Sequence, residues 1–256
     1  FLEGQFGQKF DWDAFADGIR RFNELNIHET NKWDVYAKCD NIAMNSMAQA
    51  FWRIYMYQQG ANKHFEREAK VIWKYFEKCL KKDIRPFKYR HRALAWSCGS
   101  TYYDSATCWL YQCWGILTVI NMDSLTGHNI VDTEDRDEMM SDIADLYARS
   151  PMRTHTVGGN RHILMMFETA AKFNCDMIVM YDDIGCKGMA GCQGLLEEEF
   201  RKHPEFHIMW MPHALMDCRT VPTAEARKVV NDYMTTVLHE EPVDPSLVDF
   251  DDSEGW

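Results

Sequence analysis

The chain has 256 residues, which is enough for one large domain or two small domains with a buried core, and this length excludes a peptide or a linker. Its 28 Lys and Arg residues are outnumbered by 39 Asp and Glu residues, and a formal net charge of −11 without a basic cluster argues against a nucleic-acid or acidic-membrane partner. With 46% hydrophobic and 26% charged residues and no apolar run near the roughly 18 residues of a membrane span, the composition indicates a soluble globular protein.

The first third of the chain has the apolar periodicity of helices. From Phe10 onward, apolar residues recur at spacings of three and four, at Trp12, Phe15, Ile19, Phe22 and Leu25. A second helix is predicted from about residue 32 to 59, ending before Gly60, and a third from about 62 to 82. Residues 1–85 are therefore predicted to form a helical connecting domain.

From Pro86 onward, short apolar segments alternate with helical patterns. Strands are predicted at residues 91–97, 116–121, 176–181 and 206–211. A helix between the first two strands is predicted to end at about residue 113. Four further helices are predicted at residues 135–149, 160–174, 193–202 and 223–238. This alternation predicts an α/β fold with a doubly wound, four-stranded parallel sheet of the flavodoxin or Rossmann type over residues 86–239.

The last segment, residues 240–256, has a different composition from the rest of the chain. It contains Pro242, Pro245 and seven acidic residues. We expect an extended acidic tail that is either disordered or laid over a partner.

Nine cysteines are scattered along the chain without a Cys-x-x-Cys pair. An odd number in this pattern argues against a disulfide scaffold and against a zinc ribbon. The thiols, 16 methionines and the lack of a signal peptide are typical of a reducing cytoplasm, where most cysteines pack as small apolar side chains. Because the first residue is Phe1 rather than Met, we expect the sequence to begin within a longer gene product.

The strongest candidate site follows the predicted strand at 176–181. In an open parallel sheet, ligands bind outside the carboxyl ends of the strands. The segment 182–191 contains Cys186 between glycines and just before a helix, where backbone N–H groups stabilise a thiolate or the negative charge of an iron–sulfur cluster. The alternative is that Cys186 is one more packing thiol.

Two weaker candidates lie elsewhere in the α/β region. His213 and Asp217 follow the last strand and could supply acid–base or binding groups, or else cap a helix and form a surface pair. The turn Gly158-Gly159-Asn160 resembles a phosphate-binding turn, but without the surrounding motif it favours a simple helix entry.

The last candidate site residues are three that follow the first strand, and the last candidate cluster ligands are further cysteines. Tyr102, Tyr103 and Asp104 follow the first strand and face the same crevice, although a tyrosine at a strand end is commonly amphipathic packing. The spacings of Cys108 to Cys113 and of Cys186 to Cys192 are not ferredoxin signatures. A complete cluster built from this chain alone is therefore not expected.

Four segments resemble, in order, the cluster-bearing subunits of the 2-hydroxyacyl-CoA dehydratases and the ATP-dependent benzoyl-CoA reductases. They are the opening LEGQFGQKFDWDAFADGIRRFNELN, the strand after Arg90-His91-Arg92, the passage GGNRHILMMFETAAKFNCDMIVMYDDIGCKG and the closing helix ARKVVNDYMTTVL. The resemblance covers nearly the whole chain. It implies two doubly wound lobes joined by helices, and a [4Fe–4S] cluster held by three cysteines of each subunit.

Cys186 matches the third of these cysteine ligands in the family. The first two belong to an amino-terminal lobe that this sequence does not contain, so the chain resembles the carboxyl-terminal two-thirds of a subunit. The resemblance assigns no proton donor, and we name no catalytic residue.

The ending that starts at MPHALMDCRT resembles the reductase branch of the family. That branch implies reduction of the ring of benzoyl-CoA or a related aromatic acyl-CoA by one-electron transfers at very negative potential. The implied partners are a homologous cluster-bearing subunit and a separate activator that hydrolyses ATP and is fed by ferredoxin. ATP would bind only the activator, and the chemistry implies an anaerobic cytoplasm.

Three alternatives stay open. The same fold and cluster could serve a dehydratase, which eliminates water from a 2-hydroxyacyl-CoA with one recycled electron. The subunit could instead be structural, with a cluster that only relays electrons, or the chain could be a cluster-free flavodoxin-like binding module in which Cys186 packs. Net electron consumption separates a reductase, which uses two electrons per product, from a dehydratase, which uses none.

Overall fold

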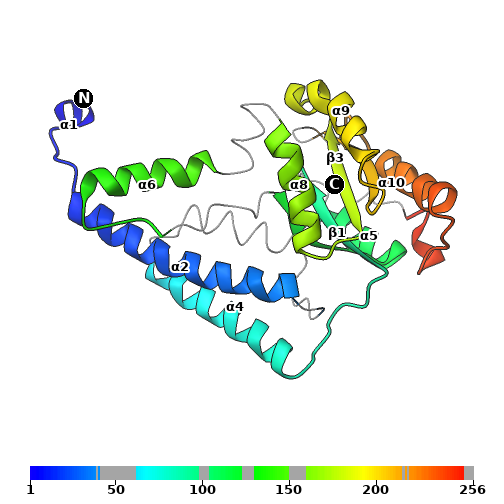
Figure 1. The fold of residues 1–256 in the computed structure, drawn as a ribbon, viewed down its shortest axis with the longest axis horizontal. Helices are drawn as coiled ribbons and strands as arrows, with labels where there is room; N and C mark the ends of the chain where they lie inside the picture. The colour runs from blue at the N-terminus through cyan, green and yellow to red at the C-terminus, as the bar shows by residue number, and fades with distance from the viewer. Residues whose placement is uncertain are drawn as a thin grey trace.

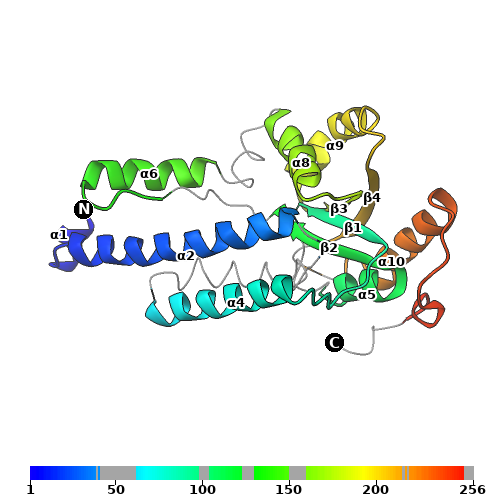
Figure 2. The ribbon, with the colours of Figure 1, turned by 60° about the horizontal axis from the view of Figure 1, so that its bottom comes forward.

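The computed structural model describes residues 1–38, 40, 62–97, 104–122, 130–149, 160–214, 217 and 219–250. The elements form a helical part and an α/β part that lie side by side (Figures 1 and 2). The helical part contains α1 (Leu2–Phe6), α2 (Trp12–Lys38), α4 (Lys63–Lys81) and α6 (Arg136–Ala148).

The helix α2 runs without a break through the region where the sequence predicted two helices. The predicted start of a second helix at about residue 32 is therefore wrong. The rest of that predicted helix, residues 39 and 41–59, lies outside the described residues. The polar residues Asn26, Glu29 and Lys32 interrupt the apolar stripe, but all three are buried. Because no glycine or proline lies between residues 19 and 38, nothing in the backbone ends the helix there.

The helices α4 and α6 lie on opposite sides of α2 (Figures 1 and 2). α4 begins as predicted, because the side chain of Asn62 caps it by accepting a hydrogen bond from the His64 amide at 3.0 Å. α6 comes from the segment between the second and third strands, and its Met139 packs with Ala16 of α2 and with Val131. That segment therefore leaves the sheet and joins the helical part.

The predicted four-stranded, all-parallel sheet is confirmed. Its strands are β1 (His91–Trp96), β2 (Ile116–Asn121), β3 (Met177–Asp183) and β4 (His207–His213), in the order β2-β1-β3-β4. β3 and β4 each continue two residues beyond the predicted end, because the parallel register extends to the pair Asp183 and His213. The carboxyl edge of the sheet therefore ends in polar side chains.

Helices cover both faces of the sheet, as a doubly wound fold requires. α8 (Asn160–Lys172) and α9 (Lys187–Phe200) contribute to the apolar cluster on one face, together with Met180 of β3. α5 (Asp104–Trp114) and α10 (Thr223–Asp232) cover the other face, where Val179 and Tyr181 of β3 point. A π-helical turn, Tyr233–Val237, continues α10.

Residues 240–250, which we call the C-terminal strap, pack on the α/β part of their own chain. The indole Nε1 of Trp109 donates to the Leu247 carbonyl at 2.7 Å, and the Val243 amide donates to the Cys113 carbonyl at 2.7 Å. The sequence predicted a tail that is disordered or laid over a partner. Backbone hydrogen bonds to α5 and a short 3₁₀ turn, Pro245–Leu247, order this part of it instead.

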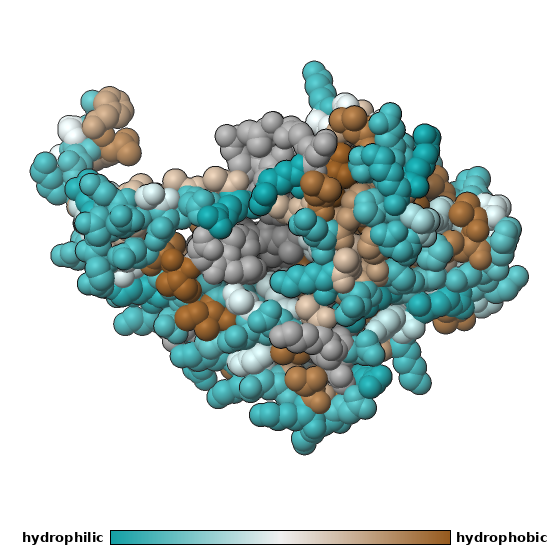
Figure 3. Space-filling view, viewed as in Figure 1, coloured by the Kyte–Doolittle hydropathy of each residue, from teal (hydrophilic) through white to brown (hydrophobic). Residues whose placement is uncertain are grey.

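Apolar side chains are exposed at the amino-terminal end of the helical part. α1 projects from the body of the molecule, and its residues Leu2 and Phe6, with the preceding Phe1, are largely exposed (Figures 1 and 3). None of the helices that the structure describes combines the length and the apolar character that crossing a membrane requires.

Candidate functional site

The connections after β1 and β3 diverge at the carboxyl edge of the sheet. β1 leads through α5 to β2 on one side, while β3 leads through α9 to β4 on the other. In a doubly wound sheet this switch point opens a crevice between the two neighbouring strands. The turn after β3 lies wholly within the described residues, whereas only Ser97 of the connection after β1 does before the gap at 98–103.

Ser97 has an unusual backbone conformation at this edge. Its φ of 72° lies in the left-handed region that non-glycine residues rarely adopt, and the residue is buried. Such conformations cluster at ligand sites because the surrounding fold must impose them. The sequence carries no signal for this feature, since serine is common in ordinary turns.

Asp183 holds the turn between β3 and α9. Its side-chain Oδ1 accepts a hydrogen bond from the Gly185 amide at 3.2 Å, and its carbonyl accepts one from the Cys186 amide at 2.9 Å. The Ile184 amide donates to the His213 carbonyl at 3.1 Å, which ties the turn to β4. The carboxylate and the neighbouring strand thus fix the position of the cysteine.

Cys186 is the N-cap residue of α9, and its side chain is half-buried. The sequence predicted that this helix begins near residue 193, but it begins at Lys187, because Met189 and Leu196 anchor the helix to the apolar cluster. Glycines at 188, 191 and 194 lower helix propensity and made the segment resemble a turn. The amino-terminal end of the α9 dipole, which favours negatively charged groups, therefore lies at this residue.

Cys192 lies on the same helix and is also half-buried. Its thiol donates to the Met189 carbonyl at 3.3 Å. Burial, together with the nearby charge of Cys186, raises the pKa of Cys192, so this thiol stays protonated near neutral pH. The turn therefore places one cysteine, Cys186, at the start of α9.

This arrangement fits one ligand of an iron–sulfur cluster, because a cluster needs deprotonated sulfur close to compensating dipoles. In the part of the chain that the structure describes, no group of three or more His, Cys, Asp or Glu side chains is placed to hold a metal ion.

His213 and Asp217 have different surroundings. His213 is fully buried at the end of β4, with its ring 5.4 Å from that of Tyr181, and burial lowers its pKa although Asp183 opposes the shift. Its imidazole is therefore neutral at pH 7. Asp217 instead accepts two hydrogen bonds from the Arg219 side chain at 2.8 Å, which hold the pKa of the exposed Asp217 carboxyl at about 2. The surface-pair interpretation is correct for Asp217.

Asp182 adds a second carboxyl group at the carboxyl edge of the sheet. Burial raises its pKa, and the neighbouring charge of Asp183 raises it further. Asp182 thus keeps a proton to a higher pH than an ordinary aspartate, a property that suits a proton donor.

Tyr102, Tyr103, Gly158 and Gly159 lie outside the described residues. Asp104 is the first residue of α5, and Asn160 is the first residue of α8, as a helix entry requires.

Cys108 and Cys113 both lie on α5, the helix on the far face of the sheet from α9. Cys108 is exposed, whereas burial raises the pKa of Cys113 to about 11.

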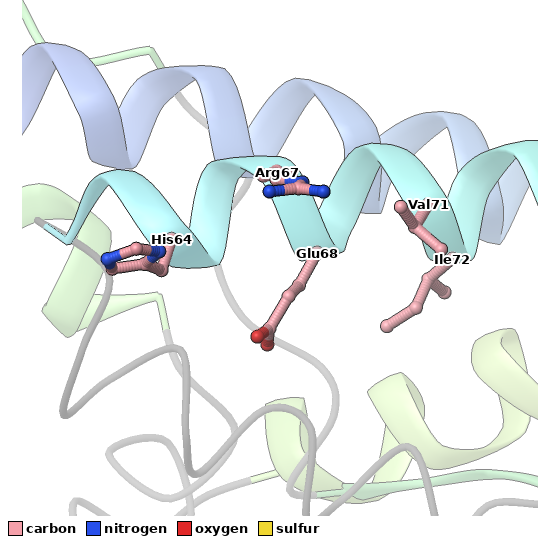
Figure 4. Close-up of a pocket in the computed structure, with 5 residues that line it drawn as sticks. All are labelled: His64, Arg67, Glu68, Val71 and Ile72. Atoms are coloured by element: carbon pink, nitrogen blue, oxygen red, sulfur yellow. The ribbon is translucent and has the colours of Figure 1, made fainter.

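A separate cavity of about 330 Å³ lies along α4 in the helical part. Five residues from successive turns of α4 line it, as Figure 4 shows: His64, Arg67, Glu68, Val71 and Ile72. The sequence carries no signal for this cavity, because charged and apolar residues at these spacings are typical of any amphipathic helix surface.

Comparison with known proteins bears on the whole arrangement. The family model described as 2-hydroxyglutaryl-CoA dehydratase, D-component, matches residues 1–216. The match includes the helical part, all four strands and the β3–α9 turn with Cys186. None of the curated proteins compared with the sequence matches it.

Proposed function

Because the chain belongs to the family of the 2-hydroxyglutaryl-CoA dehydratase D-component, we propose that it is a subunit of an iron–sulfur acyl-CoA reductase. In this proposal the enzyme reduces the ring of benzoyl-CoA, or of a related aromatic acyl-CoA, by low-potential one-electron transfers. The family is that of the benzoyl-CoA reductases and 2-hydroxyacyl-CoA dehydratases, as the sequence resemblance predicted.

The position of Cys186 is the observation that carries this proposal. Cys186 is the N-cap residue of α9 at the switch point of the sheet, where ligands bind in doubly wound folds. We propose Cys186 as one ligand of a [4Fe–4S] cluster, with the remaining ligands in an amino-terminal lobe that precedes these residues in the subunit. When bound, such a cluster supplies single electrons at very negative potential.

The residues around Cys186 would set the environment of the cluster. The amino-terminal end of α9 favours negatively charged groups such as a cluster, and Asp183 keeps the turn in place through the Gly185 amide. Met189 and Leu196 belong to the apolar cluster beneath the helix, which excludes water from one side of the site. Solvent exclusion and amide dipoles are the means by which a protein tunes the potential of a cluster.

The partners follow from the same proposal. We expect a homologous cluster-bearing subunit, an activator that hydrolyses ATP and receives electrons from ferredoxin, and an acyl-CoA substrate. Because clusters at such potentials are destroyed by oxygen, we expect the complex to work in an anaerobic cytoplasm.

A dehydratase is the second candidate. The description of the matching family model favours it, since that description names a dehydratase component. The match ends at residue 216, while the resemblance to the reductase branch rests on the ending from Met211 onward, most of which follows the match and includes the helix α10 and the C-terminal strap. In this second function the same site would start the elimination of water from a 2-hydroxyacyl-CoA.

The test is an anaerobic assay of the purified complex with the ATP-dependent activator. Benzoyl-CoA and 2-hydroxyacyl-CoA thioesters are supplied side by side, and electrons consumed per product are counted together with iron and acid-labile sulfide. We expect two electrons per product with benzoyl-CoA. Turnover of a 2-hydroxyacyl-CoA without net electron consumption would reject the reductase in favour of the dehydratase. A complex without iron would reject both functions.

A further inference from the structure

At the amino edge of the sheet, opposite the candidate site, a buried histidine lies between two carboxylates. His91 opens β1, and its side chain is 8% exposed. Its Nδ1 lies 2.7 Å from Oδ2 of Asp176, and its Nε2 lies 3.0 Å from Oε1 of Glu240. When both carboxylates are ionised they only accept hydrogen bonds, so hydrogen bonds at both ring nitrogens require the doubly protonated imidazolium.

The two carboxylates come from distant parts of the chain. Asp176 directly precedes β3, and its other oxygen accepts a hydrogen bond from the Arg92 amide at 2.7 Å. Glu240 is the first residue of the C-terminal strap. The imidazolium therefore joins the strap to the central strands of the sheet.

The strap is held along its length by further contacts with α5 and the start of β1. The Val243 amide donates to the Cys113 carbonyl, and the Cys113 thiol, which is completely buried, donates to the Asp244 carbonyl at 3.8 Å. Arg90 donates to Oε2 of Glu240 at 2.7 Å and to the Glu241 carbonyl at 2.8 Å. The strap thus covers part of α5 and shields Cys113 from solvent.

We propose that His91 acts as a pH-sensitive clasp that fastens the C-terminal strap to the amino edge of the sheet and loosens it when the imidazolium loses its proton. A neutral imidazole carries only one proton and donates only one hydrogen bond, so deprotonation leaves one of the two carboxylates facing a lone pair. The inference does not depend on the cluster or on the substrate.

The charged groups around His91 determine the direction of the pH effect. Burial would lower the pKa of His91, but the hydrogen bonds and charges of Asp176 and Glu240 outweigh it and raise the pKa above 6.5. Arg90, which precedes β1, and Arg92 of β1 are the sequence neighbours of His91. The ring of His207 from β4 lies 5.8 Å away, and Glu241 follows Glu240 in the strap.

These shifts define the pH range in which the clasp is closed. Because the pKa of His91 is raised, its contribution is complete below about 6.5 and is lost as the pH rises through the higher pKa of the docked state. On the acid side, burial opposes ionisation of Asp176 and Glu240, but their hydrogen bonds lower both pKa values. The carboxylate contribution is therefore lost only in more strongly acidic solution. Arg90 still donates hydrogen bonds to Glu240 and to the Glu241 carbonyl, so the strap loosens above the pKa of His91 without detaching.

Amide hydrogen exchange across pH 6 to 9, corrected for the intrinsic exchange rate, tests the proposal at the Val243 amide. We expect its protection to fall with rising pH, by about tenfold for each unit by which docking raises the pKa of His91. Glu240→Gln removes the charge from the strap without altering β1, and His91→Gln removes the titrating group. Both variants should give low protection that does not change with pH. The control is His239→Asn, which replaces a neighbouring exposed histidine and should behave like the wild type. Wild-type protection that is independent of pH, or Glu240→Gln with the wild-type pH dependence, would overturn the proposal.

A second measurement, the chemical modification of Cys113, is made at constant pH and so avoids the pH dependence of the intrinsic rate of amide hydrogen exchange. The modification rate of Cys113 by N-ethylmaleimide, divided by that of the exposed Cys108 on the same helix, reports how far the strap is open. At pH 6.0 this ratio should rise several-fold in Glu240→Gln relative to the wild type. An unchanged ratio would mean that the strap stays closed without the clasp.

Discussion

The helix that carries Cys186 should be held in place mainly by its buried face, and two adjacent leucines allow a matched test. Leu196 is completely buried in the apolar cluster beneath α9, whereas Leu195 is 54% exposed on the same turn of the helix. Replacing each by Ala removes the same atoms at nearly the same helix position. The difference between the two variants therefore isolates burial.

The magnitude follows from the surroundings of each side chain. Leu196→Ala loses the transfer free energy of a buried side chain and leaves a cavity, and such changes cost about 2–5 kcal/mol of the free energy of unfolding. Leu195→Ala at the exposed site should change it by no more than about 0.5 kcal/mol. With a urea m value of about 1–3 kcal/mol per molar, Leu196→Ala should lower the unfolding midpoint by about 0.7 M or more.

Urea unfolding followed by tryptophan fluorescence and by circular dichroism measures both variants against the parent protein. Coincident transitions from the two probes are the condition for comparing free energies. Equal destabilisation by the two substitutions, or a loss below 1 kcal/mol for Leu196→Ala, would refute the packing of α9 described above.

Two further predictions concern the helical part and the thiols. Asn23 donates to the Val131 carbonyl at 2.9 Å and accepts from its amide at 3.0 Å, so Asn23→Ala should leave both backbone groups unsatisfied and cost about 1–3 kcal/mol. Thermal unfolding checks this against Asn31→Ala on the exposed face of α2, and equal melting temperatures would contradict it. Iodoacetamide at pH 8 should modify Cys108 but not Cys175, because burial raises the pKa of Cys175 to about 12. Rapid modification of Cys175 in the folded chain, detected by peptide mass spectrometry, would be inconsistent with its burial.

The strands could be predicted from the sequence because their side chains are buried on both faces. In β3 every residue from Met177 to Tyr181 is buried, and such continuous apolar runs are typical of central parallel strands. The strand ends could not be predicted, since Asp183 and His213 are polar residues that are paired in register at the edge. Their place in the sheet depends on the neighbouring strand.

The continuity of α2 shows a second limit of sequence patterns. Lys32 and Glu29 look like surface residues, yet they form an ion pair at 2.6 Å with both side chains almost completely buried. Charged residues are seldom buried in this way unless they are paired, so a pattern of hydrophobicity places them on the outside and suggests a helix boundary.

The candidate site was predictable in its location but not in its local geometry. Cys186 follows the most apolar strand, and ligands of doubly wound sheets bind outside the carboxyl ends of the strands. These two facts indicated the carboxyl edge of the sheet as the location. Its role as the N-cap of α9 depends on the burial of Met189, which overrides the low helix propensity of the neighbouring glycines. The left-handed conformation of Ser97 likewise arises from tertiary structure.

The most direct test of the account is the iron content of the anaerobically purified complex with Cys186→Ala in this subunit. Cys108→Ala, an exposed thiol on α5, serves as the matched control, and circular dichroism verifies that both variants fold. The account predicts that Cys186→Ala loses iron and acid-labile sulfide from this subunit while Cys108→Ala keeps the wild-type amounts. Wild-type iron content in folded Cys186→Ala would contradict the assignment of Cys186 as a cluster ligand.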